Sequence, residues 1–166
     1  MTRATWIQIF LFLYVLGAIA AVGPTLTYAM WLSRGERAGA EVRAFVLRTT
    51  SWVDGRLATP AFMVQAVTGT ALILLLKLRF LHTAWLLAGI GTYVLLTAFA
   101  IGVYAPTVRR QTILAEQVAT DSSSRELSVE YEGVARRARA FGILAIALTL
   151  AILYFMIVKP KLWSAG

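Results

Sequence analysis

The chain has 166 residues, of which 59% are hydrophobic and only 14% are charged, and its mean hydropathy is +0.73. A soluble domain carries charge on roughly a quarter of its residues, so this composition excludes a protein whose whole surface faces water. The lack of cysteine excludes disulfides, iron–sulfur clusters and thiolate zinc sites. The net charge of +8 comes from basic residues that flank apolar stretches, where they meet lipid phosphates, and we expect no nucleic-acid partner.

Four stretches are long and apolar enough to cross a bilayer, which takes about 20 residues of helix. They cover about residues 5–33, 57–76, 80–108 and 140–158. No internal repeat or low-complexity tract divides the chain. The sequence therefore predicts an all-α fold, a four-helix transmembrane bundle in a single domain over residues 1–166, with membrane lipids as partners.

The first stretch contains a glycine and a proline close to its middle, and a proline there removes one backbone hydrogen bond and bends the helix. Small residues four positions apart precede it, and this spacing lets two helices approach closely in a bilayer. We predict a bent helix packed tightly against its neighbours, with a ligand cavity at the bend as the alternative. The residues that mark it are Gly17, Ala21, Gly23 and Pro24.

An amphipathic pattern follows the first stretch. Val42, Phe45, Val46 and Thr49 recur at helical spacing, which predicts a short interfacial helix lying on the lipid headgroups. Trp52 comes next, at the membrane–water boundary where tryptophan is common. The eight acidic residues all fall in the segments before span two and after span three, so we expect no ionisable side chain within a span.

Polar side chains are few within the four stretches. The hydroxyls of Thr25 and Thr27 are expected to bond the carbonyl group that Pro24 frees. Gln65 is the side chain most costly to leave facing lipid. It either bonds a neighbouring helix or helps to line a small pocket for a lipid, quinone or pigment tail.

The third and fourth stretches are predicted to form a hairpin that extends into the cytoplasm. A turn at residues 120–124 separates two helical patterns, and Ser123 with Glu126 forms a capping box. The helix that begins there runs without proline for about 35 residues into the fourth stretch, or roughly 50 Å. Such a helix is longer than a bilayer is thick, so the tip of the hairpin must project from it.

Basic residues gather on this hairpin and give it a predicted docking surface. Folding the hairpin about its turn is expected to place Arg109 and Arg110 level with Glu132. The residues that we expect to contact a partner are Arg109, Arg110, Tyr131, Arg136, Arg137 and Arg139. An anchor to the inner lipid leaflet is the alternative for the last three arginines.

The distribution of Lys and Arg predicts the orientation. Eleven of these residues lie in the long segments after the first and third stretches, against five at the termini and in the short connection at residues 77–79. The positive-inside rule therefore predicts long loops in the cytoplasm and both termini outside. We expect a multi-pass protein of the bacterial inner membrane.

The segment YVLGAIAAVGPTLTYAM carries a resemblance, together with Trp52, Pro60, Gly69 and the Tyr104-Ala105-Pro106 end of the third stretch. These residues resemble a family of bacterial four-helix integral membrane proteins of unknown function. That family is distantly similar to the HemJ-type protoporphyrinogen oxidases and the CopD copper-resistance membrane proteins.

The resemblance also bears on haem. In such relatives the first span commonly reads His-x-x-Gly-x-x-x-x-x-Gly, and the histidine is a candidate haem ligand. Tyr14, Gly17 and Gly23 stand at these positions here, so both glycines match and a tyrosine replaces the histidine. A tyrosine can also ligate haem iron.

No metalloprotease, phosphate-loop or nucleophile-elbow motif occurs, and we expect no catalytic residue and no metal site. The sequence favours a non-catalytic accessory or scaffold subunit that binds other membrane-protein subunits or further copies of itself, without a cofactor. The alternative is a degenerate haem- or quinone-binding redox protein that uses Tyr14, His82 or Gln65. A carrier of small solutes is the third hypothesis.

Overall fold

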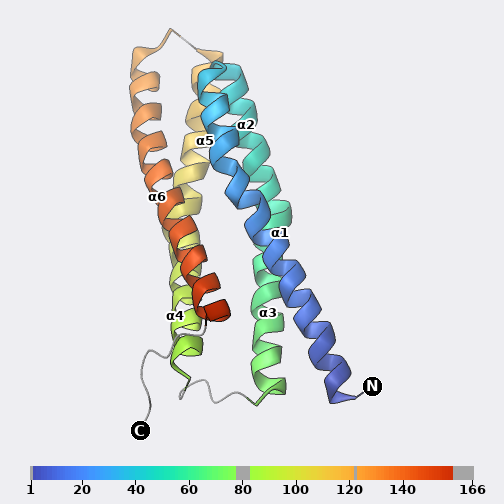
Figure 1. Cartoon of the computed structure of the whole chain (residues 1–166). Coiled ribbons are helices and arrows are strands. Elements are labelled where there is room, and N and C mark those ends of the chain that lie inside the picture. The colour runs from blue at the N-terminus through green and yellow to red at the C-terminus, as the bar shows by residue number, and fades with distance from the viewer. Residues whose placement is uncertain (1, 78–82, 122, 159–166) are drawn as a thin grey trace.

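Four long helices form the molecule in the computed structural model, which describes residues 2–77, 83–121 and 123–158 (Figure 1). The helices alternate in direction, and each is long and apolar enough to cross a membrane. The predicted all-α, four-helix fold is therefore confirmed. His82 and Arg79 lie outside the described residues.

The first long helix is α1 (Arg3–Arg37) and the last is α6 (Arg125–Val158), and each is α-helical throughout. The other two long helices are composite. The second consists of α2 (Ala40–Val53), η1 (Asp54–Ala58) and α3 (Thr59–Leu75). The third consists of α4 (Ala84–Phe99), η3 (Ala100–Tyr104) and α5 (Ala105–Thr120). The segments η1 and η3 are π-helical, so each long helix passes from α to π geometry and back without ending.

The predicted hairpin is present and long. The α4–η3–α5 helix has 37 residues and α6 has 34, which correspond to roughly 50 Å or more at 1.5 Å per residue. The hydrocarbon core of a bilayer is only about 30 Å thick. The polar ends of α5 and α6 must therefore stand outside the membrane, although the side on which they stand remains a prediction.

The helix expected over residues 42–49 forms, but it does not lie on the headgroups as a separate element. It is part of α2, which continues through η1 into α3 as one helix of 36 residues. The face that packs against α1 and α5 carries the buried Ala44 and Leu47, whereas Val42 and Phe45 of the predicted apolar stripe are exposed. As a further difference, Asp54 belongs to this continuous helix and not to a loop.

The polar end of the molecule is a compact four-helix head. It is made of α2, α5, the end of α1 and the start of α6, which lie side by side in the upper half of Figure 1. Its core contains Leu47, Leu114, Val118, Tyr131 and Val134. Water surrounds this end, so burying apolar side chains stabilises it directly.

The other half consists of two helix pairs that separate from one another (Figure 1). Along one pair, α1 packs against α3, and the guanidinium of Arg3 donates from Nε to the carbonyl of Leu75 over 2.9 Å. Along the other, α4 packs against α6. Between the pairs, α3 and α4 barely touch, although the hydroxyl of Tyr93 donates to the carbonyl of Phe62 over 2.8 Å.

Two details of the hairpin differ from the prediction. The start of α6 is capped by Ser124, whose hydroxyl accepts from the backbone N–H of Leu127 at 3.3 Å, while the Ser123 hydroxyl donates to Asp121. Arg110 pairs with Glu130 and not with Glu132. Residues 130 and 132 are about 200° apart around a helix, so they flank the buried Tyr131 on opposite sides.

Candidate functional site

The small residues of α1 form a close contact with α3. Gly17 and Ala21 are buried, and Ala21 is 0% exposed. A Cβ added at Gly17 would lie 3.3 Å from the carbonyl oxygen of Ala61 and 3.6 Å from Cβ of Gln65. Gly23 is different, because nothing lies within 4 Å of a Cβ added there. The close approach of α1 and α3 thus depends on the first two residues and not on Gly23.

Pro24 lies within α1, which continues to Arg37. The nearby threonines do not bond the carbonyl that the proline frees, which is that of Ala20 four residues before. Thr25 donates instead to the carbonyls of Val22 (2.8 Å) and Ala21 (3.4 Å), and Thr27 donates to that of Pro24 (2.8 Å). Each hydroxyl bonds a carbonyl three or four residues before it, so neither of them bonds the carbonyl of Ala20.

An apolar groove of about 270 Å³ lies beside Pro24, between α1 and α2. Tyr28 and Trp31 line it from α1, and Phe45 and Val53 line it from α2. A cavity at this proline was the alternative to plain packing. The groove is open to the surroundings of the helices, and its wall is almost entirely apolar, so it suits a hydrocarbon or aromatic group.

Two of the three residues considered for a cofactor meet between α1 and α3. The hydroxyl of Tyr14 lies near the side chain of Gln65, which is buried. The ring of Tyr14 faces Gly69, where an added Cβ would lie 3.1 Å from Cε2. One edge of this phenol ring is therefore in close contact with α3. The third residue, His82, lies outside the described part of the chain.

The helical head holds a buried polar network around Tyr131, which is 2% exposed. Its hydroxyl donates to Oε1 of Glu36 over 2.6 Å and accepts from Nε2 of Gln111 over 3.4 Å. Arg43 lies above the ring, with Cζ 4.1 Å from its centroid, and its Nη1 is 3.8 Å from Oε2 of Glu36. One phenol thus joins α1, α2, α5 and α6.

The surroundings keep this phenol protonated. Burial, followed by the hydrogen bond to the Glu36 carboxylate, raises the pKa of Tyr131, which lies outside the apolar stretch 140–158. The neutral hydroxyl can therefore serve as the donor that Glu36 requires across the physiological range. Glu36 takes part in two of the three polar contacts, with Tyr131 and with Arg43, so the network fixes how the four helices meet.

Tyr131 does not lie where a contact residue would. We expected it at the docking surface, but its side chain is in the core, because it continues the buried face of α6 that includes Val134, Ala135 and Ala138. The five arginines of the expected surface are exposed, namely Arg109, Arg110, Arg136, Arg137 and Arg139. Of the six residues that we expected to contact a partner, the five arginines are thus the ones available at the surface.

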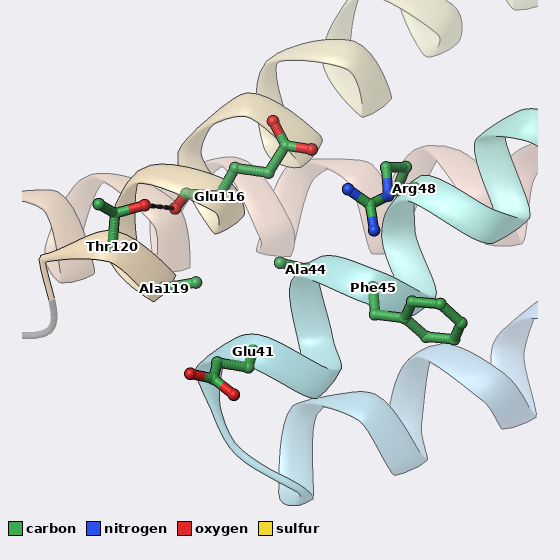
Figure 2. A pocket seen from close by; sticks show the side chains of 7 residues that line it. All are labelled: Glu41, Ala44, Phe45, Arg48, Glu116, Ala119 and Thr120. Atoms are coloured by element: carbon green, nitrogen blue, oxygen red, sulfur yellow. Dashed lines mark hydrogen bonds between the residues drawn. The ribbon is translucent and has the colours of Figure 1, made fainter.

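A second groove, also of about 270 Å³, runs over the head between α2 and α5 (Figure 2). Glu41 and Arg48 border it from α2, and Glu116 borders it from α5. Among the described residues, none of these three charges forms an ion pair with another. The groove is shallow and carries mixed charge, which is typical of a solvated surface.

The sequence interpretation missed Glu36 and Gln111. A pattern could have revealed Gln111, because it stands on the stripe that Leu114, Ala115 and Val118 continue at helical spacing. A polar residue on an apolar stripe must find a buried partner. Glu36 had no such pattern, since it lies at the end of α1 and meets Tyr131 only through the packing of α1 on α6.

Comparison with known proteins places the chain among membrane proteins. No curated protein and no solved structure matches it. The sequence profile of one family, described as predicted integral membrane protein, matches residues 8–160, which is most of the chain and includes all four long helices in whole or in large part. The chain therefore belongs to this integral membrane protein family, DUF2269.

Proposed function

We propose that the protein is a non-catalytic accessory or scaffold subunit of a larger complex in the bacterial inner membrane. The observation that carries this proposal is the separation of the α1/α3 pair from the α4/α6 pair. A self-contained four-helix bundle packs its helices around a common core along their length. Here that packing is complete only in the head, and the apolar surfaces of the other half are left for lipid or for helices of another subunit.

The third long helix offers a specific contact point. Ala98 and Gly102 are small, exposed and four residues apart, and no atom lies within 4 Å of a Cβ added at Gly102. The equivalent pair on α1, Gly17 and Ala21, is already covered by α3. Small residues at this spacing let a second helix approach closely in a bilayer. A partner helix can therefore pack at Gly102 without displacing any side chain of this chain.

The head would act as the extramembrane docking part, on the cytoplasmic side by the positive-inside rule. Its buried network and apolar core hold it rigid, and the exposed arginines of α5 and α6 give it a basic surface. An acidic segment of a partner subunit complements this charge. Binding to a rigid surface loses less conformational entropy than binding to a mobile one.

The test is purification from native membranes in a mild detergent, followed by native electrophoresis and identification of the associated chains. We expect the wild-type protein to migrate in an assembly larger than one chain. The variant Gly102→Leu should lose the partner, since the new side chain blocks the close approach of a helix. Gly23→Leu is the matched control, because Gly23 is likewise a helical glycine with free space around its Cβ position.

One result would count against the subunit function, and a second would count only against the contact point. One is an isolated monomer from native membranes at every detergent concentration. The other is an assembly that Gly102→Leu leaves intact, which would exclude the contact at Ala98 and Gly102.

The apolar groove beside Pro24 favours a second candidate function, the binding of a quinone or lipid tail. Its aromatic and aliphatic walls match such a tail, and it lies where α1 and α2 meet. Organic extraction of the purified protein and mass spectrometry of the extract would test this. We expect about one bound molecule per chain, reduced by Val53→Trp, which fills the groove. An extract with only bulk lipid in both proteins would contradict this candidate.

A further inference from the structure

The second long helix carries a carboxylate on its buried seam. Four buried residues lie on one stripe of this helix, at the spacing of three and four residues that keeps side chains on one face. They are Ala44, Leu47, Ala58 and Ala61. Ser51 and Asp54 occupy the positions that complete the stripe between Leu47 and Ala58. Seam positions are normally apolar or small, because they face the neighbouring helices. A serine and an aspartate thus stand where the helices of the bundle meet.

Hydroxyl groups from other helices gather around Asp54. Tyr28 of α1 and Tyr104 of η3 both lie close enough to interact electrostatically with its carboxylate. Ser51 precedes Asp54 by one turn on the same helix face. A Cβ added at Gly142 of α6 would lie 3.7 Å from the Tyr104 hydroxyl. The groups around Asp54 therefore come from the first, second and third long helices, and α6 approaches Tyr104 at Gly142.

These polar groups are not satisfied by one another. Among the described residues, the buried Oη of Tyr28 and Oγ of Ser51 have no hydrogen-bond partner. The Asp54 carboxylate likewise has no ion pair with a described residue, and Arg56 lies instead over the ring of Trp52. The Tyr28 hydroxyl interacts electrostatically with the Asp54 carboxylate but does not form a hydrogen bond with it. A water or an ion can bridge polar groups at such a separation and satisfy them.

We propose that Asp54, Ser51, Tyr28 and Tyr104 bind a hydrated monovalent metal cation, Na⁺ or K⁺. The groups offer one negative charge and several neutral oxygens, which suit a hard cation of single charge. The described residues contain no group of three His, Cys, Asp or Glu side chains, the donor set that a divalent transition metal takes. The π-helical segments that begin at Asp54 and end at Tyr104 also fit a site, since such segments are frequent at functional positions.

The cation would link three of the long helices just below the head, where the two helix pairs begin to separate. Asp54 begins η1 and Tyr104 ends η3, so one ion between them ties the second and third long helices together. Tyr28 adds the first helix. Binding therefore stabilises the folded protein by an amount that grows as RT ln(1 + c/Kd), where c is the cation concentration.

The experiment measures the unfolding temperature of the full-length protein in detergent, in NaCl, KCl or choline chloride at equal ionic strength. We expect the temperature to rise with the logarithm of the Na⁺ or K⁺ concentration once this exceeds Kd, and to be unaffected by choline. Asp54→Asn should abolish the rise, because the amide carries no charge. Asp121→Asn, at the exposed tip of the hairpin, is the matched control and should keep the rise in full.

A second variant keeps the proposal testable if Asp54→Asn fails to fold. Tyr28→Phe preserves the ring and removes one oxygen, and it should raise by about tenfold the cation concentration that gives the same rise in unfolding temperature. Equal unfolding temperatures in the three salts would overturn the proposal. So would a cation effect that persists in Asp54→Asn, or stabilisation by lower pH alone without any difference between the salts.

Discussion

Tyr131 shows how one side chain can organise the head. Its ring fills the apolar core between α2, α5 and α6, and its hydroxyl bonds Glu36 at the end of α1. A hydrogen bond to a carboxylate contributes more than one between neutral groups, about 1.5–3 kcal/mol. Glu36 is partly exposed and also faces Arg43. Water can therefore replace part of the stabilisation that the hydrogen bond from Tyr131 gives to its carboxylate.

Replacing this tyrosine tests the network. Tyr131→Phe keeps the packed ring and removes the donor, and we expect a loss of about 1–2 kcal/mol in the free energy of unfolding. Denaturant unfolding in detergent micelles, followed by circular dichroism, would measure it. Tyr154→Phe is the control, because Tyr154 is exposed on α6 and its ring contact with Phe155 survives the change. Equal losses in the two variants would show that the Glu36 bond adds nothing.

At the scale of the helix, the contact of α1 with α3 depends on the absence of side-chain atoms. Gly17 faces the backbone of Ala61, while Gly23, six residues later, faces open space. Both glycines were predicted to mark the packed part of the helix. The spacing of small residues indicated that the helix packs closely, but the position of α3 decided which glycine lies in the contact.

The two glycines therefore give a paired prediction. Gly17→Leu forces α1 and α3 apart, and overpacking of this kind costs about 1–3 kcal/mol. Gly23→Leu should change stability little, since its side chain enters free space around the helix. Thermal unfolding of both variants in the same detergent provides the comparison. Similar unfolding temperatures for the two would mean that α1 and α3 are not in close contact at Gly17.

On the scale of the whole molecule, the chain divides into a packed head and two separated helix pairs. The head faces water, which drives its apolar side chains together. No such force acts between helices in lipid, where close packing and hydrogen bonds decide association. The two pairs accordingly rely on contacts such as Gly17 with Ala61 and Gly89 with Met156.

The orientation of the head can be tested with single cysteines, because the natural chain has none. Ser123→Cys lies at the hairpin tip, and Thr2→Cys lies at the opposite end of the molecule. With long loops in the cytoplasm, a membrane-impermeant maleimide should label Thr2→Cys in intact cells. Ser123→Cys should react only after the membrane is opened. The reverse pattern would place the head outside the cell.

The sequence by itself determined the four long helices, the membrane as their surroundings and the hairpin that outgrows the bilayer. These features follow from hydropathy, helix length and turn residues, which act locally along the chain. The tertiary structure alone decided that α2 joins the bundle, that Tyr131 lies in the core and that Asp54 lies near Tyr28 and Tyr104. These outcomes depend on which helix faces meet, and residues far apart in the chain set that together.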